Sequence, residues 1–100
     1  MLYPFMTLPD ETEIVHSEMI LSDGIKHVKV CIEKPVEGGF QSAICWLPEN
    51  RWEKVTGYTQ EELDKLHKLI QSRIAEIYQR AGEYSLNLAR ITNKESCPHE

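Results

Sequence analysis

The sequence predicts an α+β fold, in which an antiparallel β-meander of three to five strands carries one long amphipathic helix packed on one face. Two observations support this fold class. Alternating apolar and polar residues, separated by turn residues, occupy the first half of the chain, and an apolar stripe at helical spacing occupies residues 63–81. A chain of 100 residues can bury about 65% of its unfolded surface, which suffices for one core. We therefore expect a single domain over residues 1–91 and a disordered tail over residues 92–100.

Turn residues divide the first half of the chain into predicted strands. A proline-containing turn at residues 9–12, the hairpin dipeptide Asp23-Gly24 and a later glycine pair separate the alternating segments. The predicted strands cover residues 6–8, 13–21, 26–33 and 40–47. Loops this short join neighbouring antiparallel strands. We expect Pro48 to end the strands and a loop with Trp52 and Tyr58 to follow.

A helix signal begins at Thr59. This residue is a suitable N-cap, and Glu62 stands three residues later, which is the spacing of a capping box. The apolar stripe recurs at steps of three and four residues and consists of Leu63, Leu66, Ile70, Ile74, Ile77 and Ala81. We expect Gly82 to end this helix in a left-handed conformation. Weak alternation over residues 84–91 predicts a last strand.

A single helix can cover only one face of the predicted sheet, yet both faces carry apolar residues. We place on the covered face Val15, Met19, Leu21, Val28, Val30, Ile32, Ala43, Cys45 and Leu47. The open face then carries Ile14, Ile20, Cys31, Ile44 and Trp46. A contiguous apolar patch of this kind is typical of a binding or dimer surface. The alternative is that the last strand, the N-terminal segment or the Trp52 loop folds over it.

Charge and composition disfavour several classes of partner. The formal net charge is −5, and the basic residues are scattered among acidic ones, whereas phosphate binding needs a basic stripe. No nucleic acid is therefore expected as a partner. No apolar run approaches the roughly 18–20 residues that cross a bilayer, so no membrane partner is expected either. The N-terminus does not resemble a signal peptide and the three cysteines form no CxxC pair, which favours the cytoplasm.

Few side chains could carry chemistry, and the sequence supports no catalytic, cofactor-binding or metal-binding assignment. His16, His27 and Cys31 could share the open face as zinc ligands, but their spacing matches no metal motif. Surface histidines and a half-buried thiol are the simpler interpretation. A Cys–His nucleophile would need Cys31 or Cys45 beside a histidine, and His27 lies about 13 Å from Cys31 along one strand. The chain contains no GxGxxG, GxxxxGK or GxSxG motif, so nothing supports an enzyme.

Several short motifs resemble a group of short uncharacterised bacterial proteins, often found in gut bacteria and mobile elements. The motifs are Tyr3-Pro4, Leu8-Pro9-Asp10, Thr12 to Ser17, Glu33-Lys34-Pro35, Gly39-Phe40, Ser42-Ala43, Cys45, Leu47-Pro48, Trp52, Gly57 and Glu61-Glu62. The resemblance covers roughly residues 1–80, and the chain departs from it at Asp10-Glu11, where the group usually has Asp-Gly. Because the group is a domain of unknown function, the resemblance implies no activity and no site residue.

The functional hypothesis follows from the open face. We expect a small protein–protein interaction or regulatory accessory protein, with Ile44 and Trp46 as anchors and a protein partner or a homodimer on that face. The alternative is an acidic inhibitor of a defence or nucleic-acid enzyme, supported by the charge of −5 and the small size.

Overall fold

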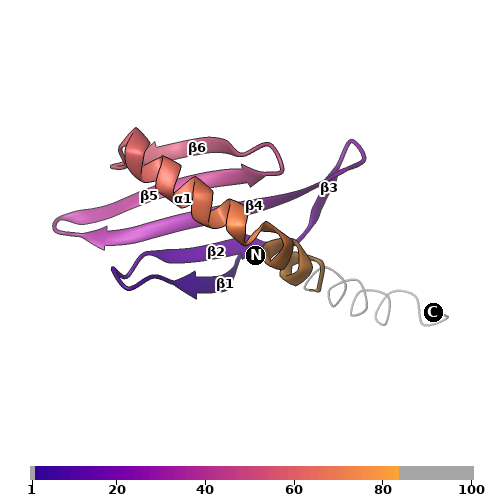
Figure 1. The fold of residues 1–100 in the computed structure, drawn as a ribbon, viewed down its shortest axis with the longest axis horizontal. Helices are drawn as coiled ribbons and strands as arrows, with labels where there is room; N and C mark the ends of the chain where they lie inside the picture. Colours follow the sequence, from indigo (N-terminus) through magenta and orange to yellow (C-terminus); the bar gives the residue numbers. More distant parts are fainter. Residues whose placement is uncertain (1, 84–100) are drawn as a thin grey trace.

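The computed structural model describes residues 2–83 of the chain. They form an α+β fold, a six-stranded antiparallel sheet followed by two helices (Figure 1). The strands are β1 (Leu2–Thr7), β2 (Glu13–Ser17), β3 (Ile20–Ser22), β4 (Ile25–Val36), β5 (Gly39–Leu47) and β6 (Arg51–Thr56), and the first helix is α1 (Gln60–Ser72). The second helix occupies residues 74–83.

Strand β4 is the middle of the sheet, whose order is β1-β2-β4-β5-β6. The first half of β4 pairs with β3 and its second half with β2, so β3 lies beyond the end of β2 on the same side. The β4–β5 hairpin is the longest ladder, with nine residue pairs from Val28↔Leu47 to Val36↔Gly39. Its tight turn uses Gly38 in the left-handed region, at a φ of 84°, which costs glycine little.

Helix α1 begins where the capping box was predicted. The Glu62 backbone N–H donates to Thr59 Oγ1 at 3.2 Å, and the Thr59 backbone N–H donates to Glu62 Oε1 at 2.9 Å. The two bonds satisfy donors that a helix start leaves without partners.

The helical segment is interrupted at Arg73, so the prediction of one continuous helix is wrong. The Ser72 hydroxyl donates to the Leu69 carbonyl oxygen at 2.7 Å. In a continuous α-helix that oxygen accepts from the Arg73 backbone N–H. The Arg73 N–H instead donates to the Ile70 carbonyl oxygen at 3.0 Å, a tighter turn. At the break, the Ser72 hydroxyl thus occupies the carbonyl oxygen that a continuous helix would use.

The hydrophobic core lies between the sheet and the helices, on the side of the sheet that α1 crosses in Figure 1. Its buried members are Ile14, Val28, Val30, Ile32, Cys45, Leu47, Ile70, Ile77 and Ala81, none more than 2% exposed. The apolar stripe predicted for the helix therefore continues across the Arg73 break. Polar contacts add to this packing, since the Tyr78 hydroxyl donates to the Lys26 carbonyl oxygen at 2.9 Å and Gln71 Nε2 donates to Asn50 Oδ1.

Several element boundaries differ from the expectation. The strand predicted over residues 13–21 is interrupted after Ser17, and a strand (β6) follows Pro48 where a loop was expected. Gly82 lies inside the second helix, so it is not the predicted helix stop. The strand predicted over residues 84–91 and the tail over 92–100 lie outside the described residues.

Strand β2 faces the opposite way from the prediction. The pairs Ile14↔Ile32 and His16↔Val30 place Ile14 and His16 toward the helices, where they are 2% and 0% exposed. Val15 pairs with Cys31 and so lies on the other face. The reason is that His16 behaves as a core residue. The rings of Tyr3 and Phe5 lie 5.9 Å and 6.2 Å from its ring, and its Nδ1 donates to the Ser17 carbonyl oxygen at 2.8 Å.

Strand β3 also differs from the expectation. Leu21, predicted on the covered face, is 69% exposed. Met19, by contrast, packs against the core as expected.

Candidate functional site

The candidate site is the face of the sheet opposite the helices, which we call the open face. Alternate residues of the strands point to it, and strand pairing arranges them in rows across the sheet. The central row contains Val15, Cys31, Ile44 and Glu53. The next row on one side contains Lys29, Trp46 and Arg51, and the next row on the other side contains Glu13, Glu33 and Ser42. Within residues 2–83 neither helix covers these rows, because both pack on the other face.

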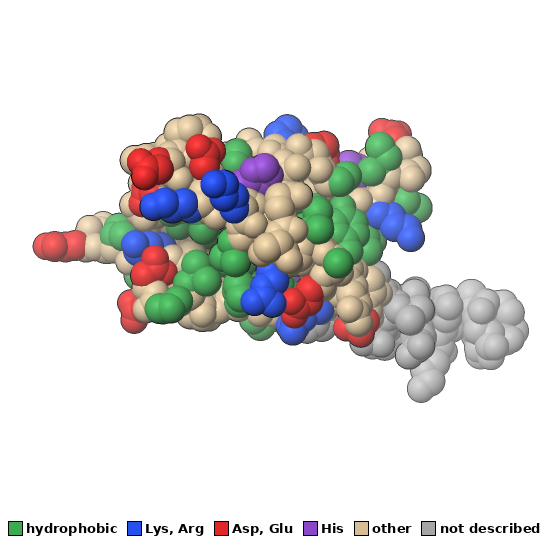
Figure 2. Space-filling model, in the orientation of Figure 1, with side chains coloured by type: hydrophobic (Ala, Val, Ile, Leu, Met, Phe, Trp, Pro, Cys, Tyr) green, Lys and Arg blue, Asp and Glu red, His purple; other side chains and the backbone are tan. Residues whose placement is uncertain are grey.

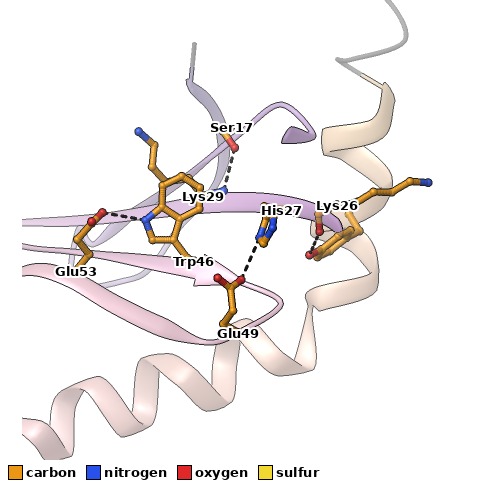
Figure 3. Close-up of polar contacts among 8 residues, drawn as sticks. Ser17, Lys26, His27, Lys29, Trp46, Glu49 and Glu53 are labelled. Atoms are coloured by element: carbon orange, nitrogen blue, oxygen red, sulfur yellow. Dashed lines mark hydrogen bonds and ion pairs between the residues drawn. The ribbon is translucent and has the colours of Figure 1, made fainter. Parts of the chain in front are cut away.

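Trp46 is the largest side chain of the open face, and its neighbours hold it in place. Its indole N–H donates to Glu53 Oε2 at 2.9 Å (Figure 3). The Lys29 ammonium and the Arg51 guanidinium lie 5.8 Å and 5.9 Å from the ring centroid, within the range of cation–π attraction. These contacts are worth roughly 0.5–1 kcal/mol each at an exposed site. The ring is therefore positioned in advance, which lowers the entropic cost of using it as an anchor.

A hollow of about 410 Å³ lies on the same face, over the central row and the row of Glu13, Glu33 and Ser42. Its floor is apolar, with Val15, Cys31 and Ile44 of the central row, and Leu2 at one side. Charged groups surround it, including Glu13, Glu33 and Lys54. An apolar floor inside a polar rim is the usual arrangement of a protein contact surface.

The charges of the open face balance each other. Its rows and its hollow carry three acidic residues and three basic ones, namely Glu13, Glu33, Glu53, Lys29, Arg51 and Lys54. The whole chain has a net charge of −5, so the acidic excess lies elsewhere on the molecule. The charges of this face therefore do not oppose contact with a second surface of the same composition.

The structure places the predicted patch residues as follows. Cys31, Ile44 and Trp46 lie together on the open face and are half-buried. Ile20 lies at its margin, paired with His27. Ile14 does not belong to the patch, since it is buried under the helices, and Val15 takes its place. Sequence reasoning missed Val15 because both alternating sets of β2 contain apolar residues. It missed Arg51, Glu53 and Lys54 because β6 was not predicted.

The two described cysteines are poor nucleophiles. Burial raises the pKa of the Cys31 thiol, with a smaller opposing effect of Lys29. Burial also raises the pKa of Cys45 to about 11, and Glu49 adds to that shift. Both thiols are therefore protonated near neutral pH, whereas a nucleophilic cysteine needs a lowered pKa.

The histidines and Cys31 do not assemble a zinc site. His16 lies on the helix-covered face and Cys31 on the open face, so the sheet separates them. His27 Nδ1 lies 3.1 Å from Glu49 Oε1 at the edge of the open face. Within residues 2–83 no three His, Cys, Asp or Glu side chains are placed to hold a metal ion.

On the helix-bearing face, a hollow of about 370 Å³ lies between α1 and residues 8–12. Lys34, Lys65, Asp10 and Glu62 line it, and Lys34 Nζ already lies 3.5 Å from Asp10 Oδ2. Figure 2 shows this face, where acidic and basic side chains alternate around hydrophobic ones. Among the described residues, no aromatic anchor comparable to Trp46 is held at this hollow by a hydrogen bond, so the open face is the stronger candidate.

Comparison with known proteins finds no matching family model, no matching curated protein and no matching solved structure. The resemblance to short bacterial proteins therefore stays a prediction. No helix in the described part of the chain combines the length and the apolar character needed to cross a membrane.

Proposed function

We propose that this chain is a small protein–protein interaction module whose contact surface is the open face of the sheet. The observation that carries the proposal is the combination, on one face, of a positioned tryptophan and an apolar hollow with a charged rim. The helices bury the other face, so they leave this surface available within residues 2–83.

Trp46 and Ile44 are the anchors of this surface. They lie on β5 two residues apart, and both are half-buried before any partner arrives. Aromatic side chains at the centre of an interface contribute most of the binding energy, commonly 2 kcal/mol or more each. The charged rim then supplies specificity and association rate more than affinity.

The bacterial or mobile-element setting rests on the sequence resemblance, and the regulatory or accessory role follows from the proposed contact surface and the small size of the chain. No group on the open face supplies a lowered thiol pKa or a metal-binding cluster within residues 2–83, so the proposal includes no catalytic step.

Affinity capture from an extract of the natural host tests the proposal. Wild-type protein, Trp46→Ala and Leu21→Ala serve as baits, and Leu21 is the control because it is 69% exposed and outside the open-face rows. We expect the wild-type bait to capture a stoichiometric partner, which is either another protein or a second copy of this chain. Trp46→Ala should abolish this capture, and Leu21→Ala should preserve it. Equal capture by both variants, with circular dichroism showing both folded, would overturn the proposal.

The salt dependence of the captured complex separates this proposal from an acidic inhibitor. Contact through an apolar hollow gives weak salt dependence and a negative heat-capacity change, whereas an inhibitor that neutralises a basic site loses affinity steeply with salt. The balanced charges of the open face favour the first outcome.

A further inference from the structure

We propose that the open face binds a second copy of this chain, face to face, about a two-fold axis that lies between the two sheets. The axis follows the central row, perpendicular to the strands, and passes between the Cys31 side chains of the two copies. This inference rests on the proposed function, because it names the partner of the same surface. Three properties of the face support it: its area, its shape and the order of its charges.

The area of the face matches that of a specific dimer. Five strands lie side by side, which at about 4.8 Å spacing gives a width of roughly 24 Å. The five strands are 5 to 12 residues long and average about 25 Å in length, so each copy contributes about 500–700 Å². Two copies together bury about 1,000–1,400 Å², which reaches the size at which specific interfaces begin.

The shape of the face is complementary to itself under this two-fold axis. Trp46 projects from the row on one side of the central row, and the hollow extends over Ser42 in the row on the other side. A two-fold axis through the central row exchanges these outer rows. Each Trp46 therefore lies opposite the partner's Ser42, so that the largest side chain of the face meets its hollow.

The charges select the same axis. Lys29 and Glu33 flank Cys31 on β4, one on each side of the central row. They lie four residues apart on one strand, about 13 Å, and so do not pair within the chain. The proposed axis places Lys29 opposite the partner's Glu33, twice in the dimer. The proposed axis also places Glu53 of the edge strand β6 opposite the partner's Glu53, so it gives two attractive pairs against one repulsive pair. An axis parallel to the strands would instead place both Lys29 and Glu33 opposite their own copies, which gives two repulsive pairs and no attractive pair between them.

The apposition of the central residues makes the geometry measurable. Cys31 lies in the central row of the central strand, so the axis places it opposite the partner's Cys31. Packed sheets are about 10 Å apart, and side chains that point at each other across that gap come within reach of a short bis-maleimide. Cys45 is buried on the other face and does not compete.

Charge reversal combined with sedimentation equilibrium tests the dimer and its orientation. We expect the wild type to dimerise, and Lys29→Glu or Glu33→Lys to raise the dimer dissociation constant about tenfold or more, because each reversal opposes like charges at two places. The double variant Lys29→Glu/Glu33→Lys should return to within about threefold of the wild type, since the pairs are restored with exchanged signs. Lys65→Glu, on the exposed surface of α1, is the matched control and should leave the constant unchanged.

Cross-linking of the full chain gives an independent readout. In a Cys97→Ser background, the bis-maleimide should give a covalent dimer through Cys31, and Cys31→Ser/Cys97→Ser should give none. A chain that stays monomeric at millimolar concentration would overturn the second copy as partner. A dimer in which the double variant shows no rescue and Cys31 does not cross-link would overturn the proposed axis.

The outcomes separate this inference from the proposed function. If the chain is monomeric and capture of a different protein is lost with Trp46→Ala, the proposed interaction module stands and the homodimer is excluded. If the chain is monomeric and no captured protein depends on Trp46, both the interaction module and the homodimer are excluded.

Discussion

The two faces of the sheet are made from alternate residues of the same strands, yet they differ in nearly every physical respect. On the helix-covered face Val30 and Cys45 are opposite each other and fully buried. In the neighbouring pair of the same two antiparallel strands, Cys31 and Ile44 are opposite each other on the open face and only half-buried. All four are apolar or nearly so. The comparison teaches that hydrophobicity alone does not decide burial in this chain, because the position of the helices does.

The reversed strand β2 offers the largest contrast between the faces. Ile14→Asp should place an unpaired carboxylate under the helices and cost about 4 kcal/mol or more, enough to threaten folding. Val15→Asp, one residue later but on the open face, should cost only about 1 kcal/mol. Urea unfolding of the two variants measures the difference. Equal destabilisation would contradict the pairing of Ile14 with Ile32 on the covered face.

Truncation of matched isoleucines sharpens the same contrast. Ile32 is 1% exposed in the core, so Ile32→Ala should lower the free energy of unfolding by about 2–5 kcal/mol. Ile44→Ala removes the same atoms from the half-buried open face, and at protein concentrations where the chain is monomeric it should cost about 1 kcal/mol. Chemical denaturation gives both values. A larger loss for Ile44 would show that something in the chain covers the open face.

The alkylation rates of Cys31 on the open face and Cys45 on the covered face distinguish the two faces. In dilute protein Cys31 should react at least about 100-fold faster than Cys45, since Cys45 reacts only when the core opens. The pKa of Cys31 is raised above its ordinary value of 9.0, so its rate should be low near neutral pH and increase through and beyond pH 9. Mass spectrometry after iodoacetamide pulses measures both rates. Comparable rates for the two thiols would contradict the assignment of faces.

The N-cap of α1 tests how much the covered face depends on its helix. Thr59→Ala removes the hydroxyl that accepts from the Glu62 backbone N–H and should cost about 1 kcal/mol. Thr59→Ser keeps the acceptor and serves as the control. Thermal unfolding followed by circular dichroism distinguishes the variants. No difference between them would show that the cap contributes nothing to helix docking.

The smallest effect concerns pH. The hydrogen bond from the Thr59 backbone lowers the pKa of the Glu62 carboxyl below its ordinary value of 4.5. The stabilisation is therefore present above pH 4.5 and is lost as the pH falls through the folded-state pKa. Glu62→Gln should reduce this acid-induced loss slightly, as measured by unfolding between pH 3 and pH 6. An unchanged pH profile would show that the Glu62 carboxylate does not cause the acid-induced loss of stability.

Much of the architecture could be predicted from local signals. The capping box at Thr59, the apolar stripe through Ile70 and Ile77, and the alternation of β4 and β5 are confirmed. These signals depend on residues close together in the sequence, and their physical causes are equally local. The prediction that Cys45 points toward the helices is also confirmed.

The candidate site was predicted only in part, and its errors share one cause. Ile14 was assigned to the open face and Val15 to the covered face, because two apolar alternations in β2 were equally consistent with the sequence. The contacts of His16 with Tyr3 and Phe5 decide between them, and those contacts join different strands. The charged neighbours of Trp46 were missed in the same way, since Arg51 and Glu53 reach it only through the pairing of β5 with β6.

The amino-acid sequence by itself determined the fold class, the start of the helix and the apolar sides of β4 and β5, because spacing along the chain sets which side chains share a side of an element. Only the tertiary structure decided which side of β2 is buried, where Ser72 interrupts the helix and which charges surround Trp46. Those outcomes depend on contacts between residues distant in sequence or on competition for a single carbonyl oxygen, and neither leaves a periodic trace in the chain.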